Sequence, residues 1–173
     1  MTILESALFY AEKCGWAVFP VNGKVPYKGS HGFKDATKDP EVIKRMWAEH
    51  PEANVAIATG EISDLLVIDI DIHPDQGKFG NETLAELETK LGELPETLEV
   101  ITGSGGRHLY FRYPENSGIT IGEGEQSGLG CGLDFRGNGG YIVAPPSVHP
   151  ETGRQYMWEV SSDLFDDPDF SME

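Results

Sequence analysis

The sequence predicts one globular domain of mixed α/β or α+β class, and three observations support this prediction. The 173 residues are enough for one domain with its own hydrophobic core. Segments with apolar residues at helical spacing alternate with short runs of β-branched and aromatic residues. The 21 glycines and 11 prolines indicate many turns and loops between these segments.

Three segments predict helices. Residues 2–14 have apolar residues at helical spacing, with Thr2 as a possible cap and Gly15 as the end. Asp39 and Pro40 form a helix start, because aspartate caps a helix and proline suits its first position. This second helix should extend to about residue 49, and a third, amphipathic helix covers residues 83–91. The second helix should bury Ile43, Met46 and Trp47.

The other apolar runs predict strands. We expect Pro20 to stop the first strand, and we expect residues 133–136 and 141–144 to pair as a β-hairpin. The predicted strands are residues 16–19, 54–58, 65–72, 98–101, 107–113, 133–136, 141–144 and 156–160. Loops are predicted at residues 22–34, 73–81 and 118–132.

Charge and cysteine content limit the class of protein. A net charge of −16 opposes general binding to nucleic acid, but six basic residues outnumber three acidic ones between positions 19 and 47. Any affinity for nucleic acid should therefore be local, weak and sensitive to salt. Two cysteines without a C-x-x-C spacing predict neither a disulfide framework nor a zinc site. With no apolar stretch of membrane-spanning length and no signal-peptide pattern, we expect a cytoplasmic protein.

The acidic pair Asp69 and Asp71 is the clearest functional signal. Both lie in an aliphatic run, residues 65–72, and side chains at i and i+2 of a strand share one face. Two like charges on one face repel each other unless a cation lies between them, and a divalent metal is the usual one. The alternative is an acidic face that is solvated or paired with arginine.

Asp134 could complete such a site. If its strand lies beside the strand of Asp69, three carboxylates converge, and this is the ligand set of a two-metal site for phosphoryl transfer. The alternative is that Asp134 only initiates the following turn.

Two loops could contribute groups that bind phosphate. In residues 102–108, glycines free backbone N–H groups, Ser104 adds a hydroxyl, and only one of Arg107 and His108 should face the site. An ordinary hairpin turn is the alternative. Two prolines before Ser147 and His149 hold that segment rigid, and the loop of Lys24 is a surface loop unless it folds over the acidic patch.

Six motifs in order resemble the N-terminal domain of bifunctional DNA primase/polymerases, the prim-pol branch of the archaeo-eukaryotic primase superfamily. The resemblance extends from about residue 7 to residue 158. The motifs are residues 15–20 (GWAVFP), 24–26 (KVP), 32–37 (GFKDAT), 67–71 (VIDID), 103–111 (GSGGRHLYF) and 133–137 (LDFRG) with 145–147 (PPS).

The resemblance implies an α+β fold of the archaeo-eukaryotic primase type. This fold has an RRM-like antiparallel sheet with flanking helices and an N-terminal α/β portion. Residues 1–173 would form a single catalytic domain whose tail, residues 161–173, is acidic.

The resemblance also implies roles for particular residues. Asp69, Asp71 and Asp134 would bind two Mg²⁺ or Mn²⁺ ions, and Ser104 and His108 would contact the nucleotide phosphates, with His108 counted among the catalytic residues. Contacts to nucleotide or template are expected from Arg136, Ser147, His149 and Lys24.

The implied activity is template-directed nucleotidyl transfer in DNA replication. The partners would be a single-stranded DNA template with its primer, a dNTP or NTP, and a helicase domain or protein. The host would be a bacterium, an archaeon, a phage or a plasmid. The chain has too few cysteines for a Cys-rich version of the family's zinc-binding insertion and shows neither the helical segment nor the helicase that often follows. It would be an excised fragment or a minimal stand-alone version, and in both cases primer extension is better supported than de novo priming.

Two other functions remain open at this point. A nucleotide-binding or nucleic-acid-binding module with the same fold but without turnover would suit the strong negative charge. A phosphatase of the haloacid-dehalogenase type also uses a D-x-D motif after an aliphatic strand. That class expects Thr or Val where this chain has His73, and a downstream lysine motif that we do not find.

Overall fold

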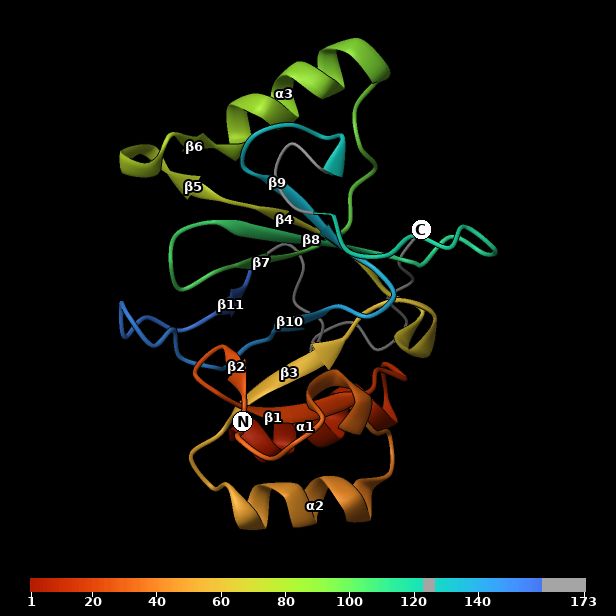
Figure 1. The fold of residues 1–173 in the computed structure, drawn as a ribbon, viewed down its shortest axis with the longest axis vertical. Helices are drawn as coiled ribbons and strands as arrows, with labels where there is room; N and C mark the ends of the chain where they lie inside the picture. The colour runs from red at the N-terminus through yellow and green to blue at the C-terminus, as the bar shows by residue number, and fades with distance from the viewer. Residues whose placement is uncertain (123–126, 160–173) are drawn as a thin grey trace.

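The structure is a computed structural model that describes residues 1–122 and 127–159 (Figure 1). The fold is α+β with antiparallel sheets, so the predicted class is confirmed. Its helices are α1 (Ile3–Glu12), α2 (Pro40–Glu49) and α3 (Gly80–Leu91). In chain order, the strands are β1 (Val18–Asn22), β2 (Val25–Pro26), β3 (Asn54–Ala58), β4 (Leu66–Ile70), β5 (Ile72–His73), β6 (Lys78–Phe79), β7 (Leu98–Ile101), β8 (Arg107–Phe111), β9 (Leu133–Arg136), β10 (Tyr141–Val143) and β11 (Met157–Trp158).

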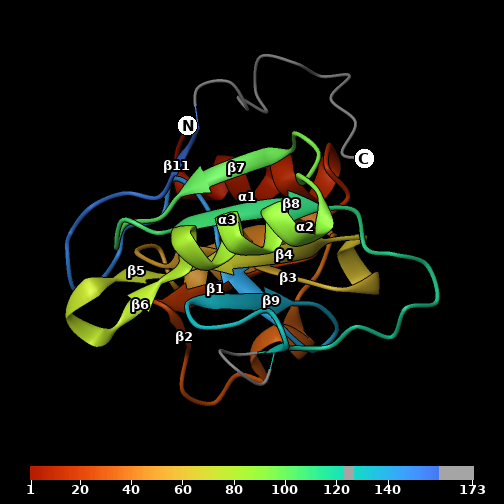
Figure 2. The same cartoon turned by 90° about the horizontal axis from the view of Figure 1, so that it is seen from above.

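The strands form two main sheets and a small hairpin. One sheet has the order β10-β3-β1-β2, the other has the order β11-β7-β8-β4-β9, and β5 pairs with β6. Figures 1 and 2 show α3 lying over one face of the five-stranded sheet, whereas the four-stranded sheet lies beyond its other face. The central strand pair β4 and β8 is therefore covered on both sides.

The three helices form largely where the sequence predicts them. Thr2 accepts a hydrogen bond from the Glu5 backbone and Glu5 bonds back to Thr2, which makes a capping box for α1. Asp39 caps α2, with Pro40 in its first position. Ile43 and Trp47 are buried as predicted, but Met46 is half-buried.

Successive side chains of the five-stranded sheet point to opposite faces, and each face packs into its own hydrophobic core. Val67, Val100 and Tyr110 join α1, α2 and the four-stranded sheet in the main core. On the opposite face, Ile70 and Leu109 pack with Leu84 of α3 in a second core. A polar group on the first of these faces is therefore directed toward the space between the two sheets.

Two sequence predictions of local structure are wrong. The first strand does not stop at Pro20 but continues to Asn22. The backbone of Val18 bonds to Thr37 on the side of β1 away from β3, and the nitrogen of Pro20 faces this same side. No strand needs an N–H group from Pro20 there, because β2 pairs only with Val21 and Asn22. The missing N–H therefore interrupts no ladder.

The predicted hairpin of residues 133–136 with 141–144 does not form either. Strand β9 pairs with β4, whereas β10 pairs with β3 in the other sheet. The glycine-rich segment between them is a crossover between sheets. This crossover lets residues on either side of it line one space.

Other differences are smaller. The predicted loop at residues 73–81 contains most of the β5–β6 hairpin, and β4 ends at Ile70, one residue before Asp71. The last predicted strand is present as β11, although residue 160 and the acidic tail lie outside the described residues. Among the helices of the described part, none is long and apolar enough to cross a membrane.

Candidate functional site

The centre of the site is a row of three side chains on neighbouring strands. Asp69 of β4 stands opposite His108 of β8 on one side and opposite Asp134 of β9 on the other. Directly opposed residues of an antiparallel pair share a face, with Cβ atoms about 4.5–5.5 Å apart. The sheet register therefore brings together two of the three predicted metal ligands and the predicted phosphate-binding histidine.

His108 is oriented by this row. Its Nε2 lies 3.4 Å from Oδ1 of Asp69, and the side chain is almost fully buried. Because a carboxylate accepts hydrogen bonds, the ring proton belongs on Nε2. Among the described residues, the buried Nδ1 of His108 has no hydrogen-bond partner, so the contact with Asp69 is the one that holds the ring.

Arg136 shares the face of the two aspartates. Its guanidinium Nη2 lies 3.6 Å from Oδ2 of Asp69 and 3.5 Å from Oδ2 of Asp134. Burial acts to raise the pKa of Asp69, but the charges and hydrogen bonds of His108 and Arg136 outweigh it, and this pKa lies below its usual value. Asp69 is therefore held as an anion inside the protein.

Asp71 extends the acidic patch beyond the end of β4. Its backbone N–H donates to the Gly132 carbonyl, so the chain keeps its direction past Ile70. The side chain pairs with Lys78 of β6, with Nζ 2.7 Å from Oδ2. Asp69 and Asp71 line the same cavity, as their i, i+2 spacing predicts.

This cavity has a volume of about 340 Å³ and lies between the acidic strand and the loops around it. A neighbouring cavity of about 390 Å³ shares part of its lining and adds Arg136 and β10. The two together make a polar groove along the face of Asp69. Both are lined by Lys24, Asp69, His108 and Tyr156.

The glycine-rich turn joins β7 to β8, so it is a hairpin turn that also reaches the cavity. Ser104 lines the cavity, and its hydroxyl lies 3.0 Å from that of Thr102. A Cβ on Gly103 would lie 2.4 Å from Cβ of His149, which means that only glycine allows the turn to pack this closely on the loop of His149. Arg107 points away and pairs with Glu99, as strand alternation predicts.

Lys24 and His149 meet at the same cavity. The Lys24 Nζ lies 3.2 Å from Nε2 of His149, and the backbone N–H groups of Glu151 and Thr152 donate to Nδ1. The ammonium group of Lys24 can only donate, so the role of each ring nitrogen depends on the tautomer of His149. Burial and the charge of Lys24 both lower the pKa of His149. The ammonium group of Lys24 therefore places a positive charge at the cavity, and a positive charge suits an anion.

A buried amide that sequence reasoning missed holds these two loops together. Asn54 of β3 donates to the carbonyls of Gly23 (2.9 Å) and Val148 (2.7 Å) and accepts from the Val148 N–H (3.0 Å). One side chain thus ties the turn of Lys24 to the loop of His149. An asparagine inside a predicted apolar strand is the signal that could have indicated it.

Ser147 lies apart from the other predicted residues. Its side chain is fully buried, its hydroxyl accepts from the Val55 N–H at 2.9 Å, and it lines neither cavity. The structure brings the other eight predicted residues to one face or groove. Six residues that line the cavity of Asp69 and Asp71 were not predicted as part of the site, namely His73, Gln76, Lys78, Thr102, Glu151 and Tyr156.

Tyr156 is the most buried of these additional residues. Its ring lies between the two site histidines, with centroids 6.2 Å from His108 and 6.1 Å from His149. Burial, together with the charges of Asp69 and Glu151, raises the pKa of Tyr156 to about 12. The phenol is therefore neutral at physiological pH.

The donor chemistry fits a hard divalent cation. Carboxylate oxygens are the ligands that Mg²⁺ and Mn²⁺ prefer, and Asp69, Asp71 and Asp134 share one face. Within residues 1–122 and 127–159, however, no three His, Cys, Asp or Glu side chains are close enough to hold an ion. Arg136 and Lys78 pair with these aspartates and offset two of their three negative charges.

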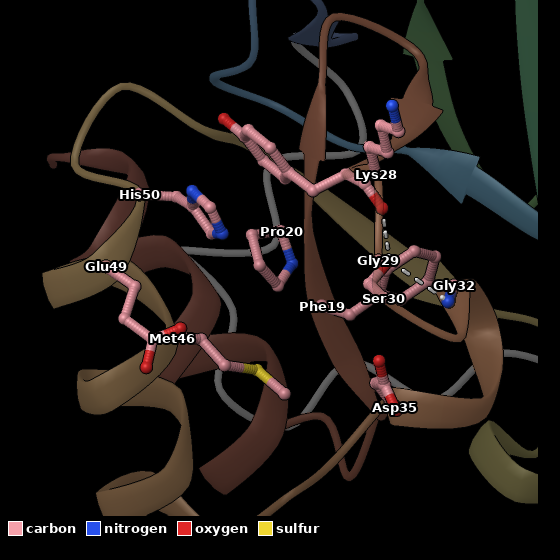
Figure 3. A pocket seen from close by; sticks show the side chains of 11 residues that line it. Phe19, Pro20, Lys28, Gly29, Ser30, Gly32, Asp35, Met46, Glu49 and His50 are labelled. Carbon is pink, nitrogen blue, oxygen red and sulfur yellow. Dashed lines mark hydrogen bonds between the residues drawn. The ribbon is translucent and has the colours of Figure 1, made fainter.

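A separate cavity of about 340 Å³ lies between the end of α2 and the segment after β2 (Figure 3). Its lining includes the stacked rings of Tyr27 and His50, whose centroids are 3.7 Å apart, and the side chains of Lys28 and Glu49. None of the nine predicted site residues lines it. We therefore place the function in the groove of Asp69.

Comparison with known proteins agrees with the motifs. The sequence model of one family, described as bifunctional DNA primase/polymerase, N-terminal, matches residues 7–169. The match covers nearly the whole chain and confirms the resemblance that the six motifs indicate. A search of curated proteins finds no match to this chain.

Proposed function

Because the chain belongs to the family of bifunctional DNA primase/polymerase N-terminal domains, we propose that it is a template-directed, metal-dependent nucleotidyltransferase. The observation that carries this proposal is the row of His108, Asp69 and Asp134 across three paired strands. Membership of the family supports primase/polymerase activity in general. The residue roles and the two-metal mechanism are our proposal.

Asp69, Asp71 and Asp134 would hold two Mg²⁺ or Mn²⁺ ions in this proposal. The ions would supply Lewis acidity for the primer 3′-hydroxyl and neutralise negative charge on the triphosphate. The protein contributes placement, because β4 and β9 hold two of the carboxylates in register before any substrate binds. His108 keeps Asp69 ionised and fixed in orientation.

The nucleotide would lie in the groove with its phosphates toward Lys24 and His149. Both side chains line the cavity, with Nζ of Lys24 3.2 Å from Nε2 of His149, and Ser104 adds a hydroxyl from the turn that packs on the loop of His149. Arg136 lines the adjoining cavity and would contact the nucleotide or the template there. Ser147 is not included in this proposal, since its hydroxyl is bonded to the backbone of β3.

The test is labelled-nucleotide incorporation on a primed single-stranded DNA template, with Mg²⁺ and with Mn²⁺. We expect Asp69→Asn and Asp134→Asn each to lose at least about 100-fold in rate, as is typical when one group that stabilises charge is removed. Glu86→Gln on α3 is the control for loss of one negative charge. Thermal unfolding of each variant checks that the fold persists. Wild-type rates in either aspartate variant would refute the assignment.

A binding module without turnover is the second candidate, and one observation favours it. Arg136 and Lys78 already pair with the aspartates and offset two of their three negative charges without metal. Binding of nucleotide and Mn²⁺ without incorporation on any template would support this candidate. A single-stranded template, a primer and an associated helicase remain proposed partners, and a cytoplasmic bacterial, archaeal, phage or plasmid origin remains a proposal.

A further inference from the structure

Lys78 makes the closest ion pair of the acidic patch. Its Nζ lies 2.7 Å from Oδ2 of Asp71, and the two side chains are 41% and 25% exposed. Lys78 lines the same cavity as Asp69 and Asp71. It thus occupies a position beside a proposed metal ligand and also faces the space in which a nucleotide would lie.

The backbone around this pair is held in place on both sides. In the β5–β6 hairpin, His73 is opposite Lys78 and Ile72 is opposite Phe79. The Gly80 N–H donates to the Asp71 carbonyl at 2.9 Å, directly after β6. The hairpin base is therefore fixed, whereas the lysine has a flexible four-carbon stem that can move its charge without moving the backbone.

The charges near Lys78 come from all three aspartates. The hydrogen bond to Asp71 raises the pKa of Lys78, and the charges of Asp71, Asp134 and Asp69 add to this effect. A divalent cation that binds these carboxylates would meet the ammonium group at close range. Two cations at such a distance repel each other, so the binding of one weakens the contact of the other.

We propose that Lys78 is an exchangeable counter-ion, which pairs with Asp71 without metal and moves to the nucleotide phosphates when a divalent cation takes Asp71. This inference rests on the proposed function and adds a coupling between its two ligands. A metal ion that binds without nucleotide must break the ion pair of Lys78 with Asp71, and the ammonium group then gains no new anionic partner. When a triphosphate is also present, the displaced ammonium group gains a new anionic partner, so metal and nucleotide bind cooperatively.

The structure shows why Lys78 suits this role better than Arg136. Arg136 bridges two carboxylates on β4 and β9 from within the sheet, and its side chain is 22% exposed. Lys78 contacts one carboxylate from a hairpin at the cavity and is about twice as exposed. A compact ammonium group also needs fewer fixed contacts than a planar guanidinium.

The test is direct Mn²⁺ binding, measured by electron paramagnetic resonance, with and without a non-hydrolysable deoxynucleoside triphosphate. Lys78→Gln should bind Mn²⁺ alone about tenfold more tightly than the wild type, because a competing charge is gone. The triphosphate should then strengthen Mn²⁺ binding about tenfold less in Lys78→Gln than in the wild type.

Two variants serve as controls. Lys90→Gln removes one positive charge from α3 outside both cavities and should match the wild type. Lys78→Arg keeps the charge and should show no gain in Mn²⁺ affinity. Unfolding temperatures of all variants confirm that they are folded.

The outcomes separate the two proposals. Equal Mn²⁺ affinity and equal coupling in the wild type and Lys78→Gln would overturn the counter-ion role and leave the polymerase proposal standing. Absence of Mn²⁺ binding in the wild type, with or without triphosphate, would overturn both.

Discussion

Substitution of Gly103 by alanine tests whether the packing of two loops builds the nucleotide site. The new Cβ would lie 2.4 Å from Cβ of His149 and 2.6 Å from the Arg154 carbonyl oxygen, distances that real Cβ contacts do not reach. Neither side yields easily. The Thr152 hydroxyl donates to the Gly103 carbonyl at 2.8 Å, and the His149 N–H donates to the Arg154 carbonyl at 2.8 Å.

The loss of stability expected for Gly103→Ala can be estimated from this crowding. Overpacking of a fixed site costs about 1–3 kcal/mol. For a domain of this size, each kcal/mol lowers the melting temperature by about 2–4 °C, so we expect a drop of about 2–12 °C. Since the loop of His149 must move away from Ser104, the affinity for a fluorescent nucleoside triphosphate should also fall, by at least about threefold.

Gly105→Ala is the matched control in the same turn. Gly105 has φ +97°, but its Cβ would meet no atom closer than the Arg154 Nη2 at 3.9 Å. Backbone strain alone should cost about 1–2 kcal/mol, with nucleotide affinity retained. Calorimetry measures the stability of both variants, and titration with the fluorescent nucleoside triphosphate measures their nucleotide affinity. Wild-type stability and affinity in Gly103→Ala would show that the reasoning about loop packing is wrong.

Two further predictions concern buried hydroxyls. Tyr156 has a folded-state pKa of about 12 against an ordinary value of 10, so its stabilising contribution is complete below pH 10 and is lost as the pH rises from 10 to 12. We therefore expect the free energy of unfolding of the wild type, measured with urea, to fall between pH 8 and pH 11 by about 1 kcal/mol more than that of Tyr156→Phe. Equal changes in the two proteins would contradict this. Ser147→Ala leaves the buried Val55 N–H without its acceptor and should lose about 1–3 kcal/mol of stability. Its primer extension per folded molecule should stay at the wild-type level, and a selective loss of nucleotide affinity would instead give Ser147 a direct role.

Local sequence signals were reliable where one short-range interaction dominates. Asp39 followed by Pro40 correctly marked the start of α2, because side-chain capping and the fixed φ of proline act within one turn. The alternation of aspartate and isoleucine also correctly placed Asp69 and Ile70 on opposite faces of β4. In both cases, the residues that decide the outcome are neighbours in the chain.

The predictions failed where distant segments decide the structure. Residues 133–136 and 141–144 are separated by a glycine-rich turn that suits a hairpin, yet each strand finds its partner in a different sheet. Pro20 remains within β1 because the strand beside it is too short to need its N–H. Lys78 lay in a segment predicted as a loop, and the sequence provides no local signal that it pairs with Asp71.

The amino-acid sequence by itself determined the start of α2 and the opposite faces of Asp69 and Ile70 in β4. Through six motifs in order, it also determined the family of this protein. Tertiary structure alone decided that Asp134 stands opposite Asp69, that Asn54 joins the loops of Lys24 and His149, and that Ser147 is buried. The physical reason is the range of the interactions. Capping and side-chain alternation act between chain neighbours, whereas strand register and loop packing depend on which distant backbone groups become hydrogen-bonded when the chain closes on itself.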